Sequence, residues 1–169
     1  LLKPRFWQKK NFFSLSLFPF SIISQLFNLI KKTSNTYNFK IKTICVGNIY
    51  IGGTGKTSLA IEINKILKKN HKTVLIKKNY KNQFDEIYLL KKYGNVIFNK
   101  NRIRSLNIAE IKKYDIAILD DGLQQKNINY DLKIVCFNSE EGAGNEFVLP
   151  AGPLRENLNE IKNYDIAFL

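Results

Sequence analysis

A glycine-rich segment followed by lysine and threonine is the part of this chain whose residue types point most directly to chemistry. Its six residues are Gly52, Gly53, Thr54, Gly55, Lys56 and Thr57. Glycines let backbone N–H groups approach an anion closely, the lysine adds a mobile positive charge, and the threonine hydroxyl can reach a magnesium ion. The segment therefore predicts a loop that binds the phosphates of a nucleoside triphosphate such as ATP, together with Mg²⁺.

This loop departs from the usual phosphate-binding pattern at one position. The full pattern has glycine at position 50, where this chain has Tyr50, and the nearest earlier glycine is Gly47. An ordinary glycine-rich turn is the alternative interpretation. An apolar run before the loop (41–46) and a helical pattern after it (58–70) favour phosphate binding.

Two aspartates follow a second apolar run. Asp120 and Asp121 come directly after residues 116–119, where a parallel strand would end at the ligand-binding edge of its sheet. Carboxylates at that edge can hold magnesium directly or through water. An Asp-Asp-Gly turn is the alternative, but the phosphate loop upstream favours a metal site.

A proline-bounded turn close to the end of the chain, 149–156, presents an arginine and a glutamate together. Arg155 could bind phosphate oxygens through its planar guanidinium, and Glu156 could complete a metal shell. A surface loop with a local ion pair is the alternative.

Apolar strand candidates alternate with helical patterns along most of the chain. Helical patterns cover 58–70, a segment ending before Gly94, and 103–111. The strand candidates are 41–46, 73–76, 95–98, 115–119, 132–137 and 165–169. Such alternation predicts an α/β fold with a mainly parallel sheet flanked by helices, like that of P-loop NTPases.

The N-terminal region has a different character. Residues 11–30 carry no charge and have lysines on both sides, and polar residues at 21, 25 and 28 fall on one face of a helix. We expect a membrane-anchoring helix lying in the interface; a true span and a buried core helix are the alternatives. The predicted organisation is an anchor over 1–32, a linker over 33–40, and a P-loop domain over 41–169.

Composition restricts the classes of partner. The 169 residues carry a formal net charge of +13, mostly from lysines scattered along the chain. Surfaces that bind nucleic acid usually have their positive charges close together and contain more arginine. We therefore expect no nucleic-acid partner, and favour an anionic membrane or a phosphorylated substrate as the partner. The two cysteines lack metal-ligand spacing, which predicts neither a zinc site nor a disulfide.

Four strings, taken in chain order, resemble the tetraacyldisaccharide 4′-kinases of lipid A (lipopolysaccharide) synthesis. They occupy 4–7, 46–57, 120–124 and 149–156, and thus span nearly the whole chain. Members of that family also lack the first glycine of the phosphate-loop pattern. The resemblance implies transfer of the ATP γ-phosphoryl group to the 4′-hydroxyl of a disaccharide 1-phosphate, at the cytoplasmic face of the bacterial inner membrane, with no obligate protein partner.

The resemblance also implies roles for individual residues. Asp85 matches the general base of the family, although a helix cap is its alternative, and Arg102 and Arg155 match positions that could contact substrate phosphate. Lys56 and Asp121 join Asp85 as catalytic residues. The residues assigned to magnesium and its surroundings are Thr57, Asp120, Asp121, Gln124 and Glu156.

The chain departs from the family in three places. It has Gln125 where members usually have histidine, and Lys78 to Lys81 replace an Arg-Gly-Tyr-Gly string. Family members also continue into a second small domain, which we expect to be absent here. Two other functions stay open: a membrane-associated P-loop NTPase switch, and a non-catalytic remnant of the kinase.

Overall fold

A six-stranded, all-parallel sheet forms the centre of the molecule in the computed structural model, which describes residues 3–30, 36–79 and 84–169. The strands lie in the order β3-β2-β4-β1-β5-β6. Their bounds are β1 Lys42–Gly47, β2 Thr73–Lys78, β3 Val96–Asn99, β4 Ile116–Asp120, β5 Leu132–Cys136 and β6 Ile166–Phe168. The predicted parallel α/β sheet is therefore confirmed.

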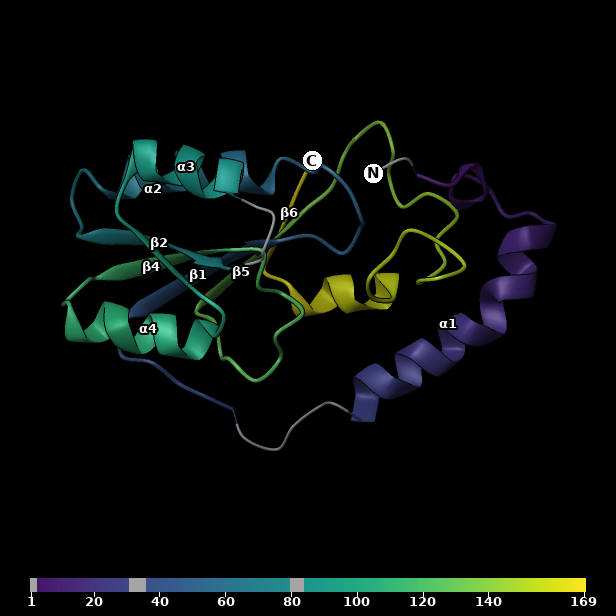
Figure 1. Cartoon of the computed structure of the whole chain (residues 1–169), viewed down its shortest axis with the longest axis horizontal. Helices are drawn as coiled ribbons and strands as arrows, with labels where there is room; N and C mark the ends of the chain where they lie inside the picture. The colour runs from purple at the N-terminus through teal and green to yellow at the C-terminus, as the bar shows by residue number, and fades with distance from the viewer. Residues whose placement is uncertain (1–2, 31–35, 80–83) are drawn as a thin grey trace.

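Helices cover both faces of this sheet (Figure 1). On one face lie α2 (Lys56–Leu67) and α3 (Phe84–Tyr93), and on the other lie α4 (Arg102–Ile111) and the 3-10 helix η2 (Leu158–Asn163). Because every strand runs in the same direction, the loops after β1, β2 and β4 meet at one edge, where such sheets bind ligands.

The core consists of one apolar layer on each side of the sheet. Neighbouring residues of β4 contribute to opposite layers: Leu119 packs with Leu106 of α4, and Ile118 packs with Ile61 of α2. A strand buried on both faces reads as a continuous apolar run, which is why its position was predictable.

Shortening one of these core side chains should destabilise the domain. Leu119 is fully buried, so Leu119→Ala is expected to lower the free energy of unfolding by about 2–5 kcal/mol through lost burial and the cavity left behind. Leu89→Ala, at a partly exposed position on α3, is the matched control. Urea unfolding measures both, and equal losses would contradict the assignment of the core.

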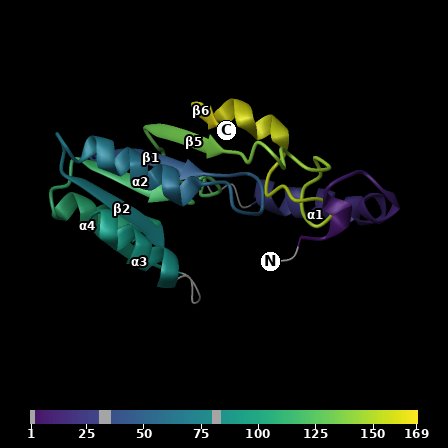
Figure 2. The ribbon, with the colours of Figure 1, turned by 90° about the horizontal axis from the view of Figure 1, so that it is seen from above.

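The N-terminal helix α1 (Phe12–Ile30) follows the short 3-10 helix η1 (Arg5–Trp7) and lies beyond the end of the sheet (Figure 2). A reciprocal cap starts it: the amide N–H of Ser14 donates to Asn11 Oδ1, and that of Asn11 donates to Ser14 Oγ. In the described part of the chain, no helix combines the length and apolar character needed to cross a bilayer.

Ser21 on the polar stripe of α1 faces the protein, whereas many apolar side chains of α1 face outward. Ser21 is buried, and its hydroxyl bonds to the backbone of Val148 and Ala151. Eight apolar side chains of α1 are 39–81% exposed: Phe12, Phe13, Leu15, Phe18, Phe20, Ile22, Ile23 and Leu26. Within the described residues, α1 is therefore not buried in the core.

The predicted linker and the surface charge can be followed in the structure. Residues 31–35 lie outside the described residues, but Tyr37 exchanges backbone hydrogen bonds with the turn containing Asn127 and Asn129.

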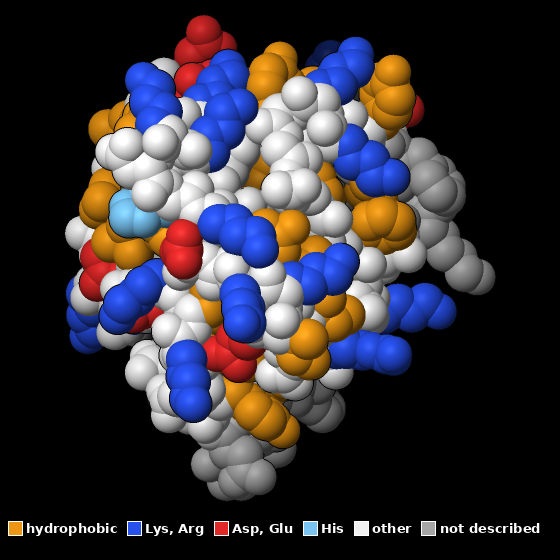
Figure 3. All heavy atoms as spheres, turned by 90° about the vertical axis from the view of Figure 1, so that its left-hand side faces the viewer, with side chains coloured by type: hydrophobic (Ala, Val, Ile, Leu, Met, Phe, Trp, Pro, Cys, Tyr) orange, Lys and Arg blue, Asp and Glu red, His pale blue; other side chains and the backbone are white. Residues whose placement is uncertain are grey.

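On the side of the molecule seen in Figure 3, Lys and Arg side chains are spread out with uncharged side chains between them. The division into anchor, linker and P-loop domain stays a prediction.

Candidate active site at the carboxyl edge of the sheet

The glycine-rich loop connects β1 to α2 as its sequence predicts. Gly55 is the N-cap of α2 and has a left-handed backbone (φ 72°), a conformation that glycine adopts without strain. Lys56 is the first residue of the helix, so its side chain and the first backbone amides of α2 lie at the same opening. A helix N-terminus of this kind is a favourable site for an anion.

A buried asparagine holds the loop from inside. The Asn48 Nδ2 atom donates to the Tyr50 carbonyl (2.6 Å) and to Thr54 Oγ1 (3.0 Å), while Gln124 Nε2 donates to the Asn48 carbonyl (2.8 Å). Gly47, just before it, allows close packing, because a Cβ there would lie 2.7 Å from Leu123 Cγ. The loop is thus fixed by the turn that follows Asp120 and Asp121.

A cavity of about 750 Å³ opens over this loop. The loop and the start of α2 form its floor, and Glu86 of α3 and Arg155 also line it. The N-terminal segment completes the wall through Lys3, Pro4 and Trp7, and Trp7 Nε1 donates to the Pro150 carbonyl (3.1 Å). The segment leading into α1 therefore borders the same cavity as the phosphate loop.

Asp120 ends β4 beside this cavity and is the centre of a buried polar network. Its Oδ2 atom accepts from Thr57 Oγ1 (2.9 Å) and from Lys77 Nζ (2.6 Å), and Lys77 also pairs with Glu86. The Oδ1 atom of Asp120 is buried and has no hydrogen-bond partner among the residues that the structure describes. Burial lowers the pKa of Lys77, but Asp120 and Glu86 outweigh it and raise that pKa, so the lysine stays charged.

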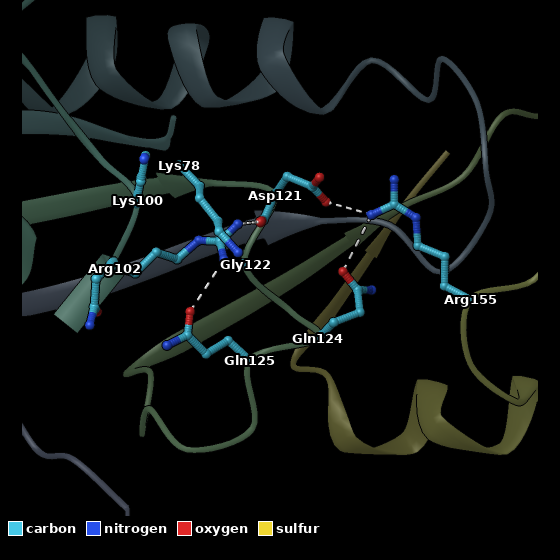
Figure 4. A pocket seen from close by; sticks show the side chains of 9 residues that line it. Lys78, Lys100, Arg102, Asp121, Gly122, Gln124, Gln125 and Arg155 are labelled. Carbon is cyan, nitrogen blue, oxygen red and sulfur yellow. Dashed lines mark hydrogen bonds and ion pairs between the residues drawn. The ribbon is translucent and has the colours of Figure 1, made fainter. Parts of the chain in front are cut away.

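A second cavity, of about 380 Å³, lies next to the first and shares Arg155 with it (Figure 4). Arg155 donates to Asp121 Oδ1 (2.9 Å) and to Gln124 Oε1 (3.4 Å). Arg102 donates to the Asp121 carbonyl and to Gln125. Four cationic side chains line this cavity, namely Lys78, Lys100, Arg102 and Arg155, so it suits an anionic group.

Residues 13–169 match the tetraacyldisaccharide-1-P 4′-kinase family. The chain belongs to this family. It is 55% identical to the tetraacyldisaccharide 4′-kinase of Pelagibacter ubique, over all of this chain and 55% of that protein. The enzyme of the same name from Rickettsia canadensis is 36% identical, over all of this chain and 58% of its own length.

A solved structure of the family shares the fold. The "apo" form of LpxK from Aquifex aeolicus, in complex with ATP, superimposes with a TM-score of 0.80 and 27% identity, covering 91% of this chain and 57% of that one. The chain thus spans a little over half the length of the curated family members that it matches.

The structure brings some of the predicted site residues of this family member together and separates others. Thr57 and Asp120 are in contact, and Asp121 and Gln124 meet at Arg155. Glu156 lines neither cavity; it is buried against Lys126 and Tyr164.

Asp85 is likewise not one of the described residues that line either cavity. It is exposed in the first turn of α3, one residue before Glu86. Metal binding by Glu156 and base catalysis by Asp85 stay predictions.

Three residues of the site were missing from the sequence-based candidates. Asn48 belongs to one of the strings that resemble the family, but no role was predicted for it. No role was predicted for Lys77 or Glu86 either. The detectable signal for Lys77 was a lysine directly after an apolar run, at the same strand end as Asp120 in the neighbouring strand.

The two cysteines have the environment of buried structural residues. Burial raises the pKa of the Cys45 thiol to about 12 and that of Cys136 to about 11, so both are thiols at neutral pH. Across the described residues, no three His, Cys, Asp or Glu side chains gather closely enough to hold a metal ion by themselves.

Proposed function

We propose that this chain carries the nucleotide-binding part of a kinase that transfers the γ-phosphoryl group of ATP to the 4′-hydroxyl of a tetraacyldisaccharide 1-phosphate in lipid A synthesis. The observation that carries the proposal is a phosphate loop under a cavity, whose Thr57 hydroxyl donates to the buried strand-end Asp120, in a chain of this family. The Aquifex aeolicus relative of the same fold was solved in complex with ATP, which supports ATP as the nucleotide.

The residues around Asp120 fit a magnesium ion. In the described part of the chain, the buried Oδ1 atom of Asp120 accepts no hydrogen bond, and the Thr57 hydroxyl donates to the other oxygen. Mg²⁺ is usually bound through one or two carboxylates, with phosphate oxygens and waters completing its shell. When bound, it would neutralise charge on the β- and γ-phosphates. Asp121, Gln124 and Glu156 remain in the proposed surroundings of this site.

The cationic second cavity fits the acceptor side of the reaction. Arg155 borders both cavities, so it can contact the triphosphate and an anionic acceptor at once, and the buried Arg102 lines the second cavity. Positioning and charge neutralisation supply most of the rate in phosphoryl transfer. We assign the acceptance of the hydroxyl proton to Asp85, at the start of α3 beside the cavity-lining Glu86.

The outward apolar side of α1 supports attachment to the cytoplasmic face of the inner membrane. Partial burial of phenylalanine and isoleucine side chains in the lipid interface, helped by nearby lysines, favours such attachment. Because the segment before α1 also borders the nucleotide cavity, this attachment would bring the cavity close to a lipid acceptor.

Phosphorylation of the lipid acceptor tests the proposed function. Membranes carrying the product of the complete gene, supplied with γ-labelled ATP and tetraacyldisaccharide 1-phosphate, are expected to label the lipid. Hydrolysis of ATP that is independent of added lipid would favour the NTPase switch. A folded gene product that binds ATP but leaves the lipid unlabelled would remove the kinase proposal.

Membrane attachment is tested by adding charge to the exposed side of α1. Phe20→Glu is expected to weaken binding to vesicles of anionic lipid by about tenfold or more, because burying a phenylalanine contributes about 1.5–3 kcal/mol. Ile66→Glu, at an exposed apolar position on α2, is the control and should bind as the unchanged protein does. Equal binding of the Phe20 variant in co-sedimentation would contradict the anchor.

A further inference from the structure

We propose that Lys77 is a positioning residue that bridges Asp120 to Glu86, and thereby sets where the first turn of α3 lies relative to the phosphate loop. This inference rests on the proposed function, because that function places the triphosphate beside Asp120 and the proton acceptor on α3. The bridge joins three elements, β4, β2 and α3, at the carboxyl edge of the sheet.

The lysine is enclosed between its two partners. The side chain of Lys77 is 3% exposed and that of Asp120 is fully buried, and the two residues are direct neighbours across β2 and β4. Glu86 is partly exposed and closes the other side of the ammonium group. One cation therefore neutralises two carboxylates that would otherwise repel each other across the edge of the cavity.

Lys77 also decides which oxygen of Asp120 stays available. Lys77 and Thr57 both donate to Oδ2, so the carboxylate is held in one orientation with Oδ1 unpaired. Loss of the lysine would leave a single hydroxyl donor on a buried carboxylate. The aspartate side chain would then be free to turn, and its alignment with Thr57 would be lost.

Stability alone does not explain this arrangement. Replacing a buried ion pair by apolar residues is often neutral or stabilising, so a buried lysine between two carboxylates is weak evidence for a purely structural role. Its effect on geometry is more specific. Glu86 directly follows Asp85 in the first turn of α3. The ion pair between Lys77 and Glu86 therefore restrains the backbone that carries Asp85, the proposed proton acceptor, without contacting its side chain.

The first test compares Lys77→Met, Glu86→Gln and the double variant in the product of the complete gene. Lys77→Met is expected to lower kcat for lipid phosphorylation by roughly 10- to 100-fold, the size that small misplacements produce, with a smaller change in KM for ATP. Glu86→Gln should lower kcat in the unchanged background but add little to Lys77→Met, because one bridge is broken in both cases.

Lys65→Met is the matched control, since Lys65 pairs with Glu62 on α2 at an exposed site. It should leave kcat unchanged. Independent, multiplying effects of the Lys77 and Glu86 variants on kcat would overturn the bridge, as would an unchanged kcat in Lys77→Met.

The second test does not depend on the lipid reaction. Hydrogen exchange should become faster in α3 of Lys77→Met and of Glu86→Gln, while the amides of α4 keep their protection. Unchanged exchange in α3 would overturn the bridge even if the kinase is active. Conversely, faster exchange in a protein that leaves the lipid unlabelled would keep the bridge and remove the proposed function.

If Lys77→Met does not fold, Glu86→Gln carries the test alone. That variant leaves the buried pair of Lys77 and Asp120 in place. Faster exchange in α3 together with a lower kcat would support the bridge. Unchanged values for both would overturn it.

Discussion

Replacing Lys56 by methionine is expected to lower kcat for lipid phosphorylation by about 100- to 1,000-fold, the range seen when one preorganised donor to developing charge is removed. Lys56 begins α2 and lines the cavity over the phosphate loop, so its ammonium group is available to the phosphates of a bound triphosphate. Methionine keeps much of the length and apolar character of the side chain while removing the charge. Initial rates with saturating ATP and lipid measure the effect.

Two controls make the Lys56 result specific. Lys65→Met removes a lysine from the same helix at an exposed site and should keep full activity. Thermal unfolding should show that Lys56→Met is folded, because the side chain takes part in the cavity and in neither apolar layer of the core. A Lys56 variant with kcat within a factor of two of the unchanged protein would contradict the assigned role.

The Asp120→Asn variant is expected to need a much higher concentration of free Mg²⁺ and to lose about 100-fold or more in kcat, since it removes the charge of a buried carboxylate that accepts a hydrogen bond from Thr57. Asparagine keeps the shape of the side chain but loses the charge that binds a cation. It also leaves Lys77 with Glu86 as its remaining anionic partner. Activity measured over a series of Mg²⁺ concentrations separates the two effects.

Asp131→Asn is the control for Asp120. Asp131 pairs with Lys42 and bonds to Thr43, at the opposite end of β1 from the phosphate loop. Its substitution should affect stability without changing the dependence on Mg²⁺. The metal assignment is contradicted if the Asp120 and Asp131 variants respond identically to Mg²⁺.

Most of the sheet could be predicted from the sequence because its strands are buried on both faces. The run 116–119 shows this. Ile118 and Leu119 are neighbours in the sequence but face opposite apolar layers, so the strand has apolar residues at successive positions. The phosphate loop was predictable for a different reason. Gly55 has a left-handed backbone and directly precedes α2. Both features depend on local sequence, because glycine favours this conformation and the helical pattern after the loop marks the start of the helix.

The buried ionic network could not be predicted in the same way. The apolar run predicts a strand over 73–76, yet β2 continues through Lys77 to Lys78. Lys77 can stay inside only because Asp120 lies next to it on another strand and Glu86 approaches from a helix. Such compensation depends on tertiary pairing, which a single sequence does not reveal.

The side chain of Glu156 illustrates the same limit. The sequence places it one residue after Arg155, and from the turn that holds both we predict phosphate binding by Arg155 and metal binding by Glu156. In the structure Arg155 reaches Asp121, whereas Glu156 is buried against Lys126 and Tyr164. Because Arg155 lines both cavities and Glu156 lines neither, adjacency in sequence carried little information about which of the two side chains reaches a cavity.

The position of the transferred phosphate tests the central claim most directly. After incubation of the gene product with ATP, Mg²⁺ and tetraacyldisaccharide 1-phosphate, phosphorus NMR of the purified lipid should show two separate phosphomonoesters, one at the 1-position and one at the 4′-position. A diphosphate at the 1-position, or inorganic phosphate with unchanged lipid, would contradict the account.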